Sequence, residues 1–489
     1  MTAIQTPKPA SPVERPRGTY DRLPDEWRRL RGLEDRLTRL VAAHGYRRVE
    51  TPVIEHAELF ARKLGGERLA QTYQFNFRGR ELALRPEHTA SAMRLYVNAL
   101  QSEPLPVRLS YGGPVFRYES PQAGRSRQFT EFGCELIGAS GLIADAETIL
   151  LALSCVREAG VERPSLVLGH IGVVLGFLEQ LRLDHRTQDW LIWSMERIRR
   201  GDEDATRIPE HLIPRPNGDV AGDLPLEALD RAAVVELLRQ SGVGFEAGSR
   251  TPEEIVDGLF EKRRRVNDRA VLEDAVGFVR ELTERSGPPA VALPALRELI
   301  ASRGLDSEPI DQLEQIVQIV IDDGFDPDAI TVDLGMGRGL RYYTGMLFEI
   351  YAEGGSGLQI AGGGRYDDLA TQLGARSEVP SAGFSLGLER LLASGTRLDT
   401  ESELPAVLVL PGDDPSGAFR LARDLRAAGW QAMVDARPRS VSASRRWAAR
   451  NGYVAVAARA ENGVSMYRCG DGAESNYPVA PRPAEVIPS

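Results

Sequence analysis

Residues Val107 to Gly138 read VRLSYGGPVFRYESPQAGRSRQFTEFGCELIG, which predicts two strands joined by a polar loop. One face of the return strand would carry Phe129, Glu131, Gly133 and Glu135, and the other Phe132, Cys134 and Leu136. The charged face also takes Arg117 and Glu119 from the incoming strand. Charges are costly to bury unless they are paired or ligand-bound. The pattern therefore indicates either a site for a polar ligand or an edge hairpin with one solvated face.

The size and composition place the chain among multidomain globular proteins. Its 489 residues exceed one compact core, and 42% hydrophobic with 27% charged residues is ordinary globular composition. No apolar run approaches the ~20 residues that span a bilayer. The proline-rich residues 1–17 lack the apolar core of a signal peptide, so we expect a disordered lead and a cytoplasmic protein.

Cysteines, histidines and net charge narrow the possible chemistry. The three scattered cysteines form no disulfide framework, and neither they nor the six histidines show metal-ligand spacing. We therefore expect no metal site, and structural roles for His88 and His170. Because the net charge is −10, a nucleic acid would have to meet a local basic patch.

The hydrophobic periodicity gives the order of the elements. An amphipathic helix is predicted from Pro24 to His44, and polar periodic helices fill residues 184–304, which we interpret as an inserted module. From Ala406 onward, strands and helices alternate as in a small α/β domain, and the proline-rich tail from Tyr477 is predicted to be disordered. Strands are expected at residues 47–55, which Pro52 interrupts, and at 70–77, 81–85, 165–168, 330–334 and 346–352.

Four distant segments share an unusual chemistry, with arginines and acids set among strand-like residues and glycine. They are RPEHT (85–89), FRYES with GRSRQF (116–129), GRGLRYYTG (337–345) and GLERLL (387–392). Guanidinium is planar, permanently charged and bidentate, so converging arginines suit a polyphosphate. Acids and tyrosines beside them would suit a second ligand that bears an ammonium or imidazole group.

These segments resemble the class II aminoacyl-tRNA synthetases, and within them the histidyl-tRNA synthetase branch. RGTYDRLPDE with the Pro52 strand resembles motif 1, GPVFRYESPQAGRSRQFTEFG resembles motif 2, and GFSLGLERLL resembles motif 3. GRGLRYYTGMLFE and AGGGRYDDL resemble the two histidine-recognition segments. The match covers about residues 17–180 and 305–395, and more loosely 405–480.

The resemblance implies an α+β fold with an antiparallel sheet flanked by helices, and a homodimer. It divides the chain into a core at residues 18–183 and 305–397, the insertion at 184–304, an anticodon-binding-like domain at 404–480 and a tail at 481–489. The implied function is a histidine–tRNA ligase, which activates L-histidine with ATP, assisted by Mg²⁺, and charges tRNA.

The resemblance also implies roles for single residues. Arg117 and Arg390 would grip the ATP phosphates, Glu119 would lie near the adenine and Arg125 on the phosphate side. Arg338 would contact both the α-phosphate and the amino-acid carboxylate. The remaining residues would bind histidine: Glu87 and Thr89 at its ammonium group, Glu131 at the position of an amino-acid contact, and Glu135, Tyr343 and Tyr366 at its imidazole.

The chain also departs from the family pattern. Ser120 replaces an arginine, Glu131 a glutamine and His88 a glycine, while Arg341 reverses a charge. Whether Glu131 and Arg341 offset each other electrostatically stays open.

A second family of this fold is therefore an alternative, the histidine-binding regulatory subunit of ATP phosphoribosyltransferase, which would partner the catalytic subunit of that enzyme. Residues 168–173, LGHIGV, resemble it. Near the C-terminus, one cluster of basic residues is interpreted either as an anticodon-binding surface or as a solvated helix face: Arg437, Arg439, Arg445, Arg446 and Arg450.

Overall fold

The computed structural model divides into two compact units, Met1–Leu398 and Asp399–Ser489, and each is considered by itself. The residues that the structure describes are 12–63, 71–118, 126–181, 183, 185–199, 201–212, 235–236, 269–336, 343–352, 357–395, 404–437 and 439–487. Within this described part of the chain, no helix is long and apolar enough to cross a membrane.

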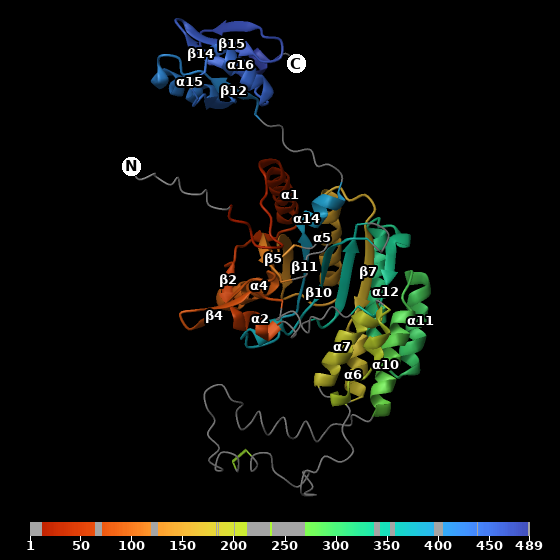
Figure 1. The fold of residues 1–489 in the computed structure, drawn as a ribbon. Helices are drawn as coiled ribbons and strands as arrows, with labels where there is room; N and C mark the ends of the chain where they lie inside the picture. Colours follow the sequence, from red (N-terminus) through yellow and green to blue (C-terminus); the bar gives the residue numbers. More distant parts are fainter. Residues whose placement is uncertain are drawn as a thin grey trace. The chain divides into compact units, whose positions relative to one another are not determined.

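An eight-stranded sheet in the order β1-β5-β6-β11-β10-β9-β7-β8 forms the centre of the first unit (Figure 1). Every pair from β5 to β7 in this order is antiparallel, and only the two edge pairs, β1–β5 and β7–β8, are parallel. The antiparallel sheet predicted from the sequence is therefore confirmed. The strands are β1 (Arg47–Arg48), β5 (Val107–Phe116), β6 (Gln128–Ile137), β7 (Ser165–His170), β8 (Ile330–Val332), β9 (Met346–Tyr351), β10 (Gln359–Arg365) and β11 (Ser381–Gly387).

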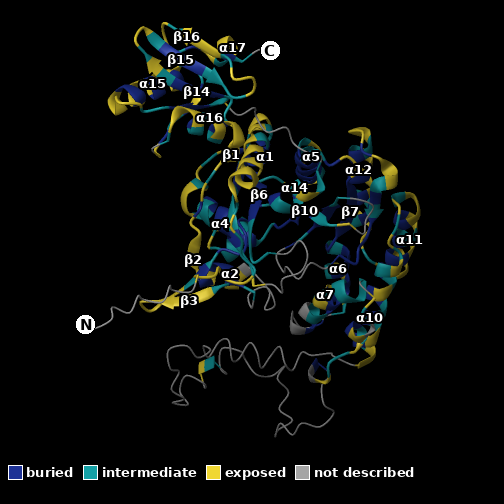
Figure 2. Cartoon of the chain, turned by 45° about the horizontal axis from the view of Figure 1, so that its top comes forward, coloured by how far each residue is buried: buried dark blue, intermediate teal, exposed yellow. Residues whose placement is uncertain are grey.

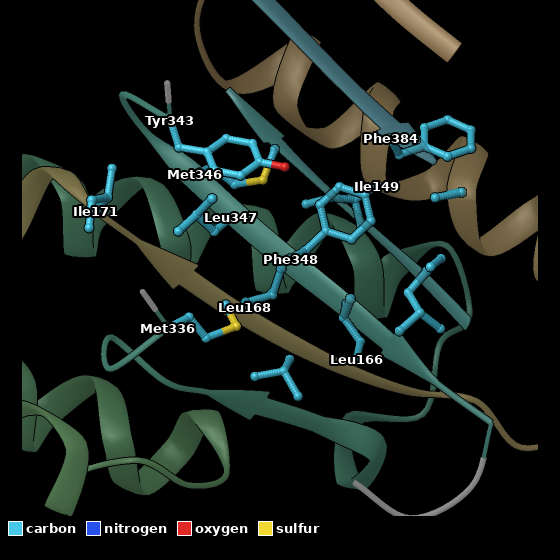
Figure 3. Packing of buried hydrophobic residues seen from close by; sticks show 14 of the residues in the cluster. Ile149, Leu166, Leu168, Ile171, Met336, Tyr343, Met346, Leu347, Phe348 and Phe384 are labelled. Atoms are coloured by element: carbon cyan, nitrogen blue, oxygen red, sulfur yellow. The ribbon is translucent and has the colours of Figure 1, made fainter. Parts of the chain in front are cut away.

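Three helices, α1 (Pro24–Ala43), α5 (Leu142–Glu158) and α14 (Leu388–Ser394), pack together and against the central strands. Helix α1 buries Leu30, Leu33, Leu37 and Val41, whose spacing of three and four residues puts them on one side of the helix. The same apolar core contains Phe132 of β6 and Ile149 of α5. In Figure 3 the ring of Phe348 lies beside Ile149, with Leu166 and Leu168 on the neighbouring strand. This packing leaves the Glu131–Glu135 face of β6 on the opposite side of the sheet.

A second, three-stranded sheet in the order β2-β4-β3 comes from residues 54–84. The expected strand at 47–55 is divided at Pro52 into β1 and β2 (Ile54–His56), because proline supplies no N–H to a ladder. Strands β3 (Gln74–Phe77) and β4 (Arg80–Leu84) form the expected hairpin, whose turn places both Arg78 and Gly79 at positive φ. Helices α2 (Ala57–Lys63) and α4 (Thr89–Leu95) follow the first and last of these strands.

Helices flank the far edge of the large sheet: α6 (Gly172–Gln180), α7 (His185–Arg199), α10 (Arg269–Glu284), α11 (Pro289–Ser302) and α12 (Glu308–Asp322). Figure 1 shows α7, α10 and α11 beyond β7. Most of residues 213–268 lie outside the described part of the chain. The predicted insertion at 184–304 therefore stays a prediction, although its described ends are helical.

The second unit has a five-stranded sheet in the order β13-β12-β14-β15-β16, in which the first three strands are parallel, as predicted. The antiparallel β15 and β16 were not expected. The prediction that the chain is disordered from Tyr477 is wrong, because Val486 in α17 is buried and Trp430 donates a hydrogen bond to the Pro481 carbonyl at 2.7 Å. The elements are β12 (Ala406–Val409), α15 (Pro415–Ala427), β13 (Gln431–Val434), α16 (Val441–Arg450), β14 (Ala455–Ala460), β15 (Gly463–Arg468), β16 (Glu474–Tyr477) and α17 (Pro483–Val486).

Candidate active site

Glycines on neighbouring strands leave room for the polar face of β6. Glu135 pairs with Gly383 of β11, which in turn pairs with Gly364 of β10. A Cβ on Gly383 would lie 1.7 Å from a carboxylate oxygen of Glu135, and one on Gly133 would lie 2.6 Å from the Tyr111 hydroxyl. Glycine is therefore required at both positions, because polar side chains lie flat against these backbones.

Glu135 receives hydrogen bonds from two buried tyrosines. The Tyr111 hydroxyl donates to Oε1 at 2.8 Å and the Tyr366 hydroxyl donates to Oε2. All three side chains are buried. Burial and the nearby charge of Glu135 raise the pKa of Tyr111 well above its usual value, so Tyr111 remains a donor. Sequence reasoning missed Tyr111, although its alternation with Gly113 on the incoming strand places it on this face.

Tyr343, in the segment before β9, lies over the glycine-lined backbone of β10. Its Cε1 lies 2.9 Å from the position that a Cβ on Gly364 would take. Figure 3 shows the Tyr343 ring beside Met346 and Leu347, with its hydroxyl directed across the sheet. The structure thus brings Tyr343 and Tyr366 to the neighbourhood of Gly364 and Glu135.

Glu131, four residues earlier on β6, is the centre of a second buried group. Its Oε2 accepts hydrogen bonds from the His88 backbone N–H and from His88 Nδ1, both at 2.9 Å, and its Oε1 lies 3.4 Å from Arg117 Nη2. Burial would raise the pKa of Glu131, but these partners outweigh it and hold the pKa at about 2. The possible offset by Arg341 lies outside the described residues, and the partners seen are His88 and Arg117.

Glu87 and Thr89 lie on either side of His88 at the start of α4. Glu87 Oε1 accepts the backbone N–H of Ala90 at 3.0 Å, and Thr89 is near enough to the Tyr111 hydroxyl to lower the pKa of that tyrosine, against the larger effect of burial. The two predicted ammonium contacts therefore flank the same buried group as Glu131.

Arg390 at the start of α14 lies close to this group. Its Cδ is 3.7 Å from the Cβ position of Gly387, and Gly387 pairs with Glu131 across the strands β11 and β6. Arg390 Nη1 donates to the Gln359 carbonyl at 3.1 Å. Arg117 thus contacts Glu131 directly, whereas Arg390 lies beside the residue that pairs with Glu131 on β11. Three further predicted residues, Glu119, Arg125 and Arg338, lie outside the described residues.

Sequence reasoning missed a network centred on Glu389, next to Arg390. Its carboxylate accepts the backbone N–H of Thr130 at 2.8 Å, a hydrogen bond from Tyr20 at 3.0 Å and an ion pair from Arg22. Burial and the Glu389 charge raise the pKa of Tyr20 to about 12. The Gly18 carbonyl also accepts the Arg127 N–H at 2.8 Å, so the chain before α1 is bound to the start of β6.

The basic cluster of the second unit is partly used internally. Arg439 pairs with Asp435 at 3.1 Å and lies over Trp447, while Arg445 lies 3.4 Å from the ring centre of Tyr467. The exposed members of the cluster are Arg437, Arg446 and Arg450.

The comparisons with known proteins agree with this geometry. The model of the family described as histidyl-tRNA synthetase matches residues 18–202 and 249–391. The histidine–tRNA ligase of Archaeoglobus fulgidus is 34% identical over 88% of this chain and 87% of its own. That of Methanocaldococcus jannaschii is 33% identical, over 81% of this chain and 79% of its own.

Solved structures share the fold. The histidyl-tRNA synthetase of S. aureus superposes with a TM-score of 0.61 and 24% identity, and covers 95% of this chain and 97% of its own. A Bacillus halodurans protein described as an ATP phosphoribosyltransferase regulatory subunit/histidyl-tRNA synthetase has a TM-score of 0.62 and 21% identity, over 89% of this chain and 97% of its own. At these identities the likeness supports the fold alone.

An antiparallel sheet flanked by helices is the fold that the chain shares with the solved structures, and the family match places this fold among the class II aminoacyl-tRNA synthetases. The family match and the curated relatives go further than the class. The chain belongs to the histidyl-tRNA synthetase family.

Proposed function

We propose that this chain performs the histidine–tRNA ligase reaction with the buried polar residues of β5, β6 and their neighbours. One observation supports this proposal most directly. Two tyrosine hydroxyls hold the Glu135 carboxylate over glycine backbone, and Glu131, which contacts Arg117, lies on the same strand. The relatives that match over most of their length are named histidine–tRNA ligase, which confirms the ligase prediction. Neither of these two relatives bears the name of the regulatory subunit.

Histidine recognition is assigned to the Glu135 end. An ionised carboxylate accepts hydrogen bonds only, so it favours the N–H groups of an imidazole over an apolar side chain of similar size. Tyr111 and Tyr366 fix the orientation of this carboxylate, and Tyr343 lies beside it. Glu87, Thr89 and Glu131 would neutralise or bind the ammonium group.

ATP binding is assigned to Arg117 and Arg390, together with Glu119, Arg125 and Arg338. A histidine carboxylate oxygen attacks the α-phosphorus of ATP, pyrophosphate leaves, and a hydroxyl of tRNA then attacks the acyl carbon and displaces AMP. The arginines balance charge and position the reacting groups in the first step. They hold the phosphates in line with the attacking oxygen.

Mg²⁺ belongs to the same proposal as the usual companion of ATP. No group of three histidine, cysteine or acidic side chains that would cage a metal ion is present among the described residues. Magnesium commonly binds through one or two carboxylates and the substrate phosphates, so such a cage is not needed. When bound, it would supply positive charge at the phosphates.

Two macromolecular partners complete the proposal. The exposed Arg437, Arg446 and Arg450 would contact tRNA phosphates through the second unit. A second copy of the chain would cover the apolar residues of the three-stranded sheet, because Ile54 and Phe77 are 50% and 57% exposed there.

The test is histidine-dependent exchange of pyrophosphate into ATP. The wild-type chain should catalyse it, and Glu135→Gln should raise the histidine KM by about tenfold or more, because one charged hydrogen-bond acceptor is lost. The ATP KM should change little. Histidine binding without any exchange by the wild type would overturn the ligase proposal in favour of a histidine sensor.

A further inference from the structure

One residue, His88, holds Glu131 with two donors, its backbone N–H and its imidazole. The backbone N–H and Nδ1 of His88 both lie 2.9 Å from the same carboxylate oxygen, and the two residues are 2% and 3% exposed. Since an ionised carboxylate only accepts, Nδ1 carries the proton of this contact. The position of the Glu131 side chain is therefore set by His88.

The other oxygen of Glu131 faces Arg117, at the longer distance of 3.4 Å. Arg117 Nε donates to the Pro86 carbonyl at 2.8 Å, and its guanidinium lies 5.0 Å from the centre of the Phe129 ring. The short contacts of the Glu131 carboxylate are thus taken by His88, and Arg117 keeps a weaker one. An arginine held in place but only loosely paired retains its attraction for a phosphate.

The face of the His88 ring contacts the histidine end of the site. The His88 ring stacks on Tyr111, with centres 4.6 Å apart and planes 8° apart, and Tyr111 donates to Glu135. One side chain therefore touches both the group that holds Arg117 and the group that holds Glu135.

We propose that His88 is a positioning residue for the first step of the reaction. Through Glu131 it keeps Arg117 available to the nucleotide, and through Tyr111 it supports the orientation of Glu135. This inference rests on the proposed function, since it assigns the nucleotide to Arg117. Without the Nδ1 donor, Glu131 is free to turn toward Arg117 and compete with the phosphates for it.

Two variants of His88 separate this role from simple packing. The amide nitrogen of asparagine reaches about the position of Nδ1, whereas that of glutamine extends toward the position of Nε2. In the exchange assay on the full chain, His88→Gln should raise the ATP KM about tenfold, the effect of one hydrogen bond to a charged group. His88→Asn should restore most of this loss. His44→Gln, the same change at an exposed histidine, is the matched control.

A third variant tests the contact of the His88 ring with Tyr111. Tyr111→Phe keeps the stacked ring and removes the hydroxyl that donates to Glu135, so it should raise the histidine KM more than the ATP KM. Should His88→Gln fail to fold, Glu131→Gln takes its place. It removes the carboxylate that would compete for Arg117, so the ATP KM should stay unchanged or fall, and a rise would contradict the positioning role.

Three results would overturn the positioning role. These are an unchanged ATP KM in His88→Gln, equal losses in the asparagine and glutamine variants, and equal rises of both KM values in every variant. Absence of exchange in the wild-type chain would instead refute the proposed function, so the two failures are distinguishable.

Discussion

His170 ends strand β7 as a buried neutral imidazole. Its Nδ1 accepts the Gly172 N–H at 3.1 Å, which leaves Nε2 as the protonated nitrogen, 3.2 Å from the Gln312 amide oxygen. Burial lowers the pKa of His170 from 6.5 to about 4. The unfolded chain therefore binds a proton at this residue in a pH range where the folded chain does not.

We therefore predict that the contribution of His170 to the free energy of unfolding is lost as the pH falls. The contribution is complete above pH 6.5 and declines between pH 6.5 and about 4, and the loss reaches about 3 kcal/mol at the acid end of that window. His170→Gln removes this titrating group, so the free energy of unfolding of the variant should depend less on pH between 6.5 and about 4. Urea unfolding of both proteins between pH 4 and 7 measures it, and parallel curves would contradict the prediction.

At the scale of the elements, the close pairing of β6, β11 and β10 depends on glycine. Gly383→Ala would put a methyl group 1.7 Å from Glu135 and 2.7 Å from the Cys134 carbonyl, so strand or carboxylate must move. We expect a cost of about 1–3 kcal/mol and a rise in the histidine KM. Gly277→Ala on α10 is the control, because a Cβ there meets nothing within 4 Å and should stabilise by about 0.5–1 kcal/mol. An unchanged histidine KM in the Gly383 variant would refute the close packing of the Glu135 side chain against Gly383.

Sequence periodicity was sufficient to predict most strands of the central sheet. The chemistry of the side chains was sufficient to predict that the acids of β6 belong to a polar site. The alternation of Glu131 and Glu135 follows from strand geometry alone. It could not reveal their partners, because His88, Tyr111 and Tyr366 come from three other segments, up to 231 residues away. The misassigned tail has a similar cause, since its order depends on a contact with Trp430 that no local composition indicates.

At the scale of the whole molecule, the two compact units carry different parts of the chemistry. All described residues assigned to ATP and histidine lie in Met1–Leu398, whereas the exposed arginines of α16 and the loop before it lie in Asp399–Ser489. Amino-acid activation and tRNA binding should therefore respond separately to substitution. The chain as a whole is acidic, with net charge −10, so tRNA contact depends on this local basic surface.

Neutralising that surface in the full chain should weaken tRNA charging and spare activation. The variant Arg437→Gln/Arg446→Gln/Arg450→Gln should raise the KM for tRNA and lower the slope of log affinity against log salt by about one for each arginine that contacts a phosphate. Pyrophosphate exchange should stay as in the wild type, because none of the three belongs to the first unit. The matched control is Arg420→Gln/Arg423→Gln/Arg426→Gln, which removes three exposed charges from α15 of the same unit. Equal losses in both variants would show a general charge effect, and an unchanged salt slope would remove these arginines from the tRNA surface.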